Sequence, residues 1–188
     1  MLTLIQFLNK IHPLDESIQQ YLLYHLKQKR LKSGDVWHRK GQICSTVAFI
    51  EEGLVKSVYQ KNERNYINWF MRENDVIISV RSFFDQIPSR ESLIAVEPTI
   101  LYYITYEEYK YLVSHHPAFH MITTSLLSFY YEKCQDRTEL LRLYRNERYQ
   151  EFMLNESELA SRISGRDMAA YLGISEDRLY ALRTGEFT

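Results

Sequence analysis

Residues 163–183 constrain the fold of this chain more than any other stretch, because they carry local signals for two short helices joined by a tight turn. Ser164 and Ser175 each stand where a hydroxyl can cap a helix N-terminus, and Asp167 is the expected reciprocal partner of the first cap. Gly173 stands where the first helix must end in a left-handed residue. The apolar positions are Met168, Ala169, Leu172, Ile174, Leu179 and Leu182. This order predicts a helix-turn-helix, whose second helix can enter the DNA major groove, and an ordinary helical hairpin is the alternative.

The chain before residue 106 reads as a helical segment followed by many short strands. Apolar residues show helical spacing over 2–29, and from residue 30 to about 105 the pattern changes to short β-type runs. These runs are 36–38, 46–50, 54–59, 66–71, 76–79, 93–96 and 100–104. Turns rich in Gly, Asn and Pro separate them. Seven or eight short strands at this spacing predict an antiparallel barrel or jelly roll.

Helical spacing returns after residue 105, with a short helix over 106–115 and a long one over 117–144 that starts at Pro117. An amphipathic stripe follows the long helix: Phe119, Ile122, Leu126, Phe129, Tyr130, Lys133 and Arg137. We expect this stripe to form a helix–helix seam in a homodimer. The alternative is a helix that packs only on its own barrel. Residues 145–148 interrupt the stripe as a hinge, and a further helix over 148–154 leads to the helix-turn-helix.

These parts together predict an α+β fold of three units. Residues 1–116 form an antiparallel, jelly-roll-like β-roll that acts as a sensor domain, and residues 117–144 form the central dimerisation helix. Residues 145–188 form a small all-α helix-turn-helix domain. Only five residues follow Arg183, so we expect no β-wing after the second helix.

The composition argues against several classes of protein. The chain has 188 residues, of which 45% are hydrophobic, and no apolar run reaches the roughly 18–20 residues that span a bilayer. The N-terminus has no signal-peptide pattern, so we expect a cytoplasmic protein without a membrane partner. Cys44 and Cys134 are isolated, and His116 and His120 lack a third ligand, so we expect no metal and no cofactor. No nucleophile elbow frames a serine, and catalysis is not expected.

The charge distribution bears on DNA binding. Residues 136–188 contain eight Arg and no Lys against ten acidic residues, which gives a net charge of −2. The remaining residues 1–135 carry fifteen basic and fourteen acidic residues, which gives +1. A DNA-binding part normally has a basic excess, because phosphate contacts supply most of the non-specific affinity. We therefore expect modest affinity for double-stranded DNA.

Several short motifs carry a family resemblance over nearly the whole chain. They are residues 32–35 (Lys-Ser-Gly-Asp), 40–42 (Lys-Gly-Gln), 49–53 (Phe-Ile-Glu-Glu-Gly), 97–99 (Glu-Pro-Thr) and 169–174 (Ala-Ala-Tyr-Leu-Gly-Ile). In this order they resemble the Crp/Fnr superfamily of bacterial transcription regulators. Residues 147–149 (Glu-Arg-Tyr) and 170–174 resemble its Bacteroidetes-type branch. The resemblance implies a cyclic nucleotide-binding-like domain, a homodimer and a small-molecule effector whose signal passes through the central helix to DNA.

The resemblance also implies where an effector would bind. In cyclic-nucleotide-binding relatives a Gly-Glu pair opens a phosphate cassette and an arginine closes it. Alignment on Glu97-Pro98 places Ser79 at the glutamate and Ser89 at the arginine, while Arg90 is one residue late and faces the opposite side of its strand unless an insertion intervenes. Cyclic AMP is therefore expected to bind weakly or not at all. The candidate pocket for another effector is Ser79, Arg81, Ser82, Phe83, Ser89 and Arg90, and a vestigial loop is the alternative.

The DNA-binding candidates are the exposed positions of the second helix: Ser175, Glu176, Asp177, Arg178 and Arg183. Relatives present a glutamate near Asp177 and an arginine near residue 181, where this chain has alanine, so Arg178 is a substitute for the missing arginine. We expect Arg178 to contact base edges and Arg183 to contact phosphate. The sequence thus predicts a ligand-responsive, homodimeric transcription regulator. The alternative is a ligand-binding or protein-interaction module whose helix-turn-helix no longer binds DNA.

Overall fold

The computed structural model describes residues 2–62 and 64–185, with the side chain of Leu2 left aside. The N-terminal segment forms two helices, α1 (Leu2–Ile11) and α2 (Glu16–His25), and Pro13 stands between them. Asp15 caps α2 by accepting a hydrogen bond from the backbone of Ile18 at 2.8 Å. The helix expected over 2–29 is therefore wrong at its end, where residues 27–29 belong to a strand.

The described residues of the β-roll form two four-stranded antiparallel sheets. The first has the order β1 (Lys27–Leu31), β8 (Thr99–Thr105), β3 (Thr46–Glu52) and β6 (Val76–Ile77). The second has the order β2 (Val36–His38), β7 (Glu91–Ala95), β4 (Val55–Lys61) and β5 (Arg64–Met71). The antiparallel β domain predicted from the sequence is confirmed. Strand β1 was missed because its Lys-Gln-Lys-Arg sequence has no strand-like alternation, and pairing with β8 determines its conformation instead.

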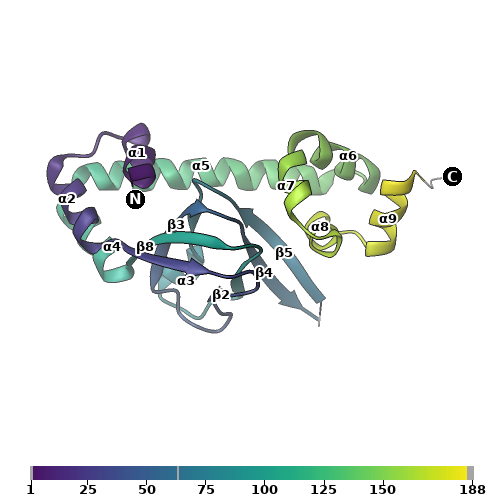
Figure 1. Cartoon of the computed structure of the whole chain (residues 1–188), viewed down its shortest axis with the longest axis horizontal. Coiled ribbons are helices and arrows are strands. Elements are labelled where there is room, and N and C mark those ends of the chain that lie inside the picture. The colour runs from purple at the N-terminus through teal and green to yellow at the C-terminus, as the bar shows by residue number, and fades with distance from the viewer. Residues whose placement is uncertain (1, 63, 186–188) are drawn as a thin grey trace.

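A long helix, α5 (Pro117–Arg142), runs along the molecule beside the two sheets, as Figure 1 shows. Helices α1, α2 and α4 (Tyr106–His115) gather at one end of α5. Helix α3 (Val80–Asp85) lies between β6 and β7 in the chain. The long helix predicted from the sequence is confirmed, although it ends at Arg142 rather than residue 144. The expected hinge at residues 145–148 is wrong, because the break falls at Leu143 and Tyr144, which have extended backbones.

Four short helices follow: α6 (Arg145–Asn155), α7 (Ser157–Arg162), α8 (Gly165–Leu172) and α9 (Glu176–Thr184). They lie at the opposite end of α5 from the N-terminus (Figure 1). The predicted caps of the last two are confirmed, since Ser164 and Ser175 accept hydrogen bonds from the backbones three residues later. Gly173 ends α8 with φ +65° in the left-handed region. Whether a wing follows concerns residues 186–188, which lie outside the described residues.

Three buried clusters hold these elements together. The first lies at the N-terminal end, where α1 and α2 pack on α4, α5 and the sheet residues Phe49 and Ile104. The second fills the space between the two sheets, and the third joins the C-terminal helices to β5. Because β5 contributes Ile67 and Phe70 to the third cluster, the outer face of the β-roll and α8 share one apolar core.

Among the described residues, no helix is long and apolar enough to cross a membrane. The same residues contain no group of three or more His, Cys, Asp or Glu side chains arranged to hold a metal ion.

Candidate functional site

An elongated cavity of about 610 Å³ follows the inner face of the β-roll and continues along α5. Most of its lining is apolar, which suits a small-molecule site of ordinary size. Within the β-roll it is lined by the polar or aromatic side chains of Ser57, Trp69, Glu91 and Tyr103. From α5 the polar lining residues are Thr123, Tyr130, Cys134, Arg137 and Thr138, and the guanidinium of Arg137 is stacked on Tyr171 at the far end of the cavity from Glu91.

The two cassette positions inferred from the resemblance lie side by side at one wall of the β-roll. Ser79 and Ser89 are both buried, and their hydroxyl oxygens are 3.0 Å apart. Ser79 also donates to Oε1 of Glu91 at 2.9 Å, and Ser57 on β4 donates to Oε2 of the same carboxylate. Ser89 donates to the backbone carbonyl of Glu91 at 2.8 Å. The cassette therefore closes around a carboxylate that belongs to the protein itself.

Ser79 occupies the position of the family's glutamate, but a carboxylate still reaches it, because Glu91 extends to it from β7. Alternation along an extended strand places Glu91 on the same face as Ser89, two residues earlier. Ser57 came from a strand more than thirty residues away, and its pairing with β7 was not readable from the sequence. The period-two rule alone was enough to find Glu91.

The cassette has no cation to match its carboxylate among the described residues. Arg90 is exposed, as the strand alternation predicted. Arg81 is also exposed and lies 3.8 Å from Asp85 on the surface of α3. His38 is buried, and burial lowers its pKa more than the neighbouring Glu91 raises it. The described part of the chain gives Glu91 no ion-pair partner.

The other two predicted pocket residues have structural contacts. Ser82 accepts from the backbone of Cys44 at 2.8 Å and donates to the carbonyl of Ile87 at 2.5 Å, which closes the loop after α3. Phe83 is fully buried and stacks edge-on against Tyr106 and Tyr109 of α4. These two side chains position α3, and they are not among the residues that line the cavity.

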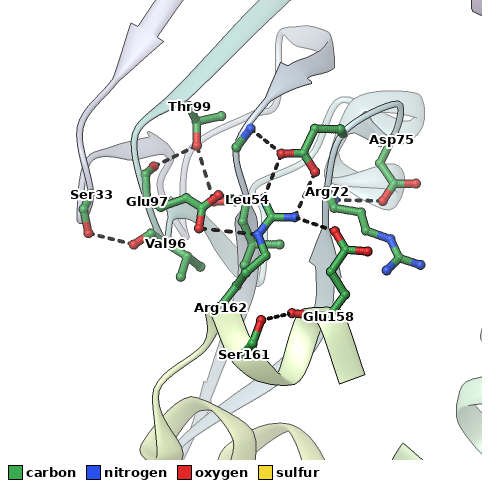
Figure 2. A network of polar contacts seen from close by, with 12 residues as sticks. Ser33, Leu54, Arg72, Asp75, Val96, Glu97, Thr99, Glu158, Ser161 and Arg162 are labelled. Atoms are coloured by element: carbon green, nitrogen blue, oxygen red, sulfur yellow. Dashed lines mark hydrogen bonds and ion pairs between the residues drawn. The ribbon is translucent and has the colours of Figure 1, made fainter. Parts of the chain in front are cut away.

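A second polar site joins the β-roll to the C-terminal helices. Arg162, the last residue of α7, donates two hydrogen bonds to Glu73 at 2.8 and 2.9 Å and two to Glu97 at 2.6 and 3.5 Å. Figure 2 shows its guanidinium between the carboxylates of the β-roll loops, with Glu97 and Glu158 on either side. Hydrogen bonds to Glu73 and Glu97 raise the pKa of Arg162 above its usual value. Such a bidentate arrangement fixes orientation as well as charge.

Helix α8 is held to the same face of the β-roll. Lys56 on β4 places its ammonium 2.8 Å from both carboxylate oxygens of Asp167. Asp167 was expected to return to the cap at Ser164, and the partner shown for its carboxylate is Lys56 instead. Next to this pair, the ring of Phe70 packs 5.2 Å from that of Tyr171. The contact between the β-roll and α8 thus combines an ion pair with a packed pair of aromatic rings.

Two arginines fasten α8 to the end of α5. Arg137 stacks 3.6 Å from the centre of the Tyr171 ring and donates to the carbonyl of that residue. Arg148 donates to the carbonyl of Leu172 at 2.6 Å and to those of Leu141 and Leu143. These cations satisfy helix-end carbonyls, so they serve the fold rather than DNA phosphates.

Much of the stripe predicted as a dimer seam is covered by the chain itself. Phe119 and Ile122 are buried against α1 and the other N-terminal elements, because those helices supply the partner that was thought to be missing. Tyr130 donates to Oδ1 of Asp75 at 3.1 Å and accepts from the backbone of Val76 at 2.7 Å. These three and Arg137 are corrections to the predicted seam. Leu126 also packs on the N-terminal cluster, whereas Phe129 and Lys133 stay exposed.

A neighbouring stripe of α5, offset by one residue, is exposed instead. Its members are Leu127, Tyr131, Cys134, Thr138 and Leu141. They follow one another at steps of four, three, four and three residues, which is the heptad spacing of a two-stranded coiled coil. Leu127 is 45% exposed and Tyr131 65% exposed, so no described element covers this face of α5, which borders the cavity at Leu127, Cys134, Thr138 and Leu141.

The residues predicted to meet DNA lie on α9, the helix farthest from the N-terminus (Figure 1). Ser175, Glu176 and Asp177 are exposed. Arg178 is half-buried and donates to Oδ1 of Asn146 on α6 at 2.8 Å. Arg183 is exposed, and one of its guanidinium nitrogens lies 3.5 Å from the sulfur of Met168. The structure therefore places four of the five on α9 and Ser175 at its N-cap, and it gives the two arginines contacts within the chain.

Comparison with known proteins agrees with this architecture. Residues 28–116 match the family model of the cyclic nucleotide-binding domain. FixK2 from Bradyrhizobium japonicum superposes with a TM-score of 0.74 at 16% identity, covering 85% of this chain and 83% of that one. CLP from Xanthomonas campestris, a c-di-GMP-responsive global regulator, gives 0.73 at 17% identity, covering 92% and 91%. A protein from Eubacterium rectale described as a regulator of the Crp/Fnr family gives 0.75 at 17% identity, covering 92% and 84%. No match was found among the curated proteins.

Proposed function

With a cyclic nucleotide-binding-type domain and a fold shared with Crp/Fnr-type regulators, we propose that this chain is a ligand-responsive transcription regulator. It works as a homodimer, binds double-stranded DNA through a helix-turn-helix formed by α8 and α9, and responds to an effector other than cyclic AMP. The observation that supports this best is the presentation of α9. Its first residues are exposed, while α8 behind it is fixed to the β-roll and to α5.

The effector belongs in the β-roll cavity, and Glu91 argues against a cyclic phosphate there. An anion beside the carboxylate would meet a like charge, and two unit charges 4 Å apart repel by about 4 kcal/mol at an effective dielectric constant of about 20. The expected cation that would offset this repulsion is replaced by Ser89, while Arg90 is exposed. Calorimetry with cyclic AMP and cyclic GMP tests the point, and submicromolar affinity for either would contradict it.

Dimerisation through the exposed stripe of α5 is the second element of the proposal. A parallel pairing would bring each stripe residue next to its own copy and place both α9 helices on one side. Since Cys44 is buried and Cys134 lies at the centre of the stripe, the variant Cys134→Ser/Leu141→Cys distinguishes the orientations. A parallel dimer joins position 141 to itself, and mild oxidation then yields a disulfide-linked dimer on a non-reducing gel.

The matched control is Cys134→Ser/Asp136→Cys, which places an exposed thiol on the opposite side of the helix. It should stay monomeric on the same gel. A parent protein that is monomeric by light scattering at micromolar concentration, or cross-linking by the control alone, would defeat the proposed seam.

Selection of bound sequences from a random DNA library tests the DNA-binding element. We expect one enriched motif with two half-sites related by two-fold symmetry. Arg178→Ala should relax the preference at one position of each half-site, and Arg183→Ala should weaken all sequences alike and reduce the salt slope by about one. Arg39→Ala, which removes an exposed charge from the β-roll, is the control and should change neither property.

The second candidate, a ligand-binding module that no longer binds DNA, is favoured by one observation. Of the eight arginines between residues 136 and 188, five make contacts within the chain: Arg137, Arg148, Arg162, Arg178 and Arg183. Little positive charge is left for phosphates. Absence of any enriched motif, both with and without cell extract as a source of effector, would favour this candidate.

A further inference from the structure

The β-roll cavity contains a carboxylate that is hydrogen-bonded but not neutralised. Ser57 and Ser79 each donate one hydrogen bond to a different oxygen of Glu91, which orients the carboxylate rigidly. An ionised carboxylate can accept about four hydrogen bonds, so each oxygen keeps acceptor capacity for a ligand. Glu91 lines the cavity, and the described residues supply no ion-pair partner for it.

A second polar group in this region is also unsatisfied. His38, on β2 beside β7, is 8% exposed, and its Nε2 has no hydrogen-bond partner among the described residues. Burial lowers the pKa of this imidazole more than Glu91 raises it, which disfavours its charged form, and no ion pair joins the two residues. Leaving a partly buried carboxylate without a cation is costly unless a ligand supplies one, and of these two groups only Glu91 lines the cavity.

Aromatic side chains that line the same cavity as Glu91 can bind a cation through their ring faces. Trp69 is the cross-strand neighbour of Ser57 on the adjacent strand β5 and lines the cavity. Tyr103, on β8 of the other sheet, packs on the same internal cluster and lines the cavity, and its ring already has the ammonium of Lys27 5.9 Å from its centre. Aromatic faces attract ammonium and guanidinium groups through the ring quadrupole, and this attraction strengthens when the cation is desolvated.

We propose that the ligand of this cavity is a small organic cation. Its primary ammonium or guanidinium group binds Glu91, and its apolar or aromatic body lies along the cavity toward α5. This ligand class would be that of the proposed effector, and its role as an effector rests on the proposed function. The binding itself does not depend on dimerisation or on DNA.

The test compares three probes that share a phenyl ring and differ in charge: phenethylamine, 2-phenylethanol and 3-phenylpropionate. Each is titrated calorimetrically into the purified full chain at neutral pH. A charge-assisted hydrogen bond to Glu91 should make the amine bind at least tenfold more tightly than the alcohol. The carboxylate should not bind measurably. Equal binding of amine and alcohol, or tightest binding of the carboxylate, would overturn the proposal.

Glu91→Gln should abolish the difference between amine and alcohol while leaving the affinity for the alcohol within about threefold. Glu107→Gln, an isosteric change at an exposed carboxylate of α4, is the control and should keep the full difference. If Glu91→Gln does not fold, Trp69→Leu gives a second test. It keeps apolar bulk, and loss of the ring face should weaken the amine by about two- to fivefold with the alcohol less affected.

Two further outcomes separate this inference from the function it deepens. Amine binding without any enriched DNA motif would support the proposed ligand class and contradict the proposed function as a transcription regulator. Tight binding of cyclic AMP that is lost in Glu91→Gln would show that Glu91 binds a ribose hydroxyl, and it would contradict the proposal that the ligand is a cation.

Discussion

Two regions of this molecule contain partly buried carboxylates, and the regions differ in whether the chain supplies those carboxylates with a cation. Where the β-roll meets the C-terminal helices, Glu73 and Glu97 share Arg162, and Asp167 has Lys56. Inside the β-roll, Glu91 receives only serine hydroxyls. In the first arrangement every carboxylate contacts a cation of the chain itself, as expected of a structural contact. The second is incomplete, which is why we assign a ligand to it.

The largest effect on stability is expected from breaking the paired region. Arg162→Met leaves Glu73 and Glu97 without their cation and should lower the free energy of unfolding by about 2 kcal/mol. The figure lies below that for a deeply buried pair, because side-chain exposure of 34% and 32% screens the two carboxylates. Urea denaturation measures the change. Arg72→Met, which removes the more exposed pair with Glu156, should cost no more than about 0.5 kcal/mol.

Acid should weaken the same contact without a mutation. Burial alone would raise the pKa of Glu73, but hydrogen bonds from Arg162 and from the Gly53 backbone lower it below the usual 4.5. A depressed pKa means that the stabilisation is complete above pH 4.5 and is lost as the pH falls through the folded-state value. Stability measured from pH 7 down to pH 3 should therefore fall in the acid range. The fall should be smaller in Glu73→Gln, and an equal fall would argue against this carboxylate as the source.

A smaller effect is expected at the second pair. Lys56→Met should destabilise the chain by about 1 kcal/mol, because Asp167 keeps a favourable position in the first turn of α8 after losing its ammonium partner. Hydrogen exchange should increase in the amides of α8 more than in those of the β-roll. Lys29→Met, at an exposed position of β1, is the control. Uniform exchange across both regions would mean that the pair does not hold α8 locally.

The smallest effect is expected in the unpaired region. Glu91→Gln removes a charge that has no cationic partner; its amide oxygen accepts from one serine hydroxyl and its NH2 group can donate to the other, so the free energy of unfolding should change by less than about 0.5 kcal/mol. A loss of 2 kcal/mol or more by thermal denaturation would show that Glu91 has a structural partner, and the contrast between the two regions would disappear.

The sequence was sufficient wherever structure depends on neighbours in the chain. The hydroxyls of Ser164 and Ser175, the left-handed Gly173 and most strands could be predicted, since caps, turns and alternation are local. Strand β1 could not, because its conformation depends on pairing with β8, about seventy residues away.

The sites show the same limit. Arg90 was included in the candidate pocket although alternation turned it to the other side of its strand, and its side chain is exposed; the same alternation would have found Glu91. It was no help with Arg162, whose partners lie 65 and 89 residues earlier in the chain. The stripe on α5 was placed one residue away from the exposed face, since amphipathicity reveals that a helix has an apolar side but not which partner covers it.

The hydroxyl of Tyr130 ties the long helix α5 to the loop between β5 and β6, which also contacts the C-terminal helices. Tyr130 on α5 binds Asp75 and Val76, and the same short loop carries Glu73, which binds Arg162. Tyr130 directly precedes Tyr131 of the exposed stripe, and successive residues of an α-helix are about 100° apart around its axis. Any rotation of α5 that a second copy imposes at Tyr131 must therefore pull on this loop. If α5 pairs with a second copy as proposed, the contacts of Tyr130 with this loop and of Glu73 with Arg162 would transmit such a rotation to α7. The orientation of α9 relative to the β-roll would then depend on how far α5 turns.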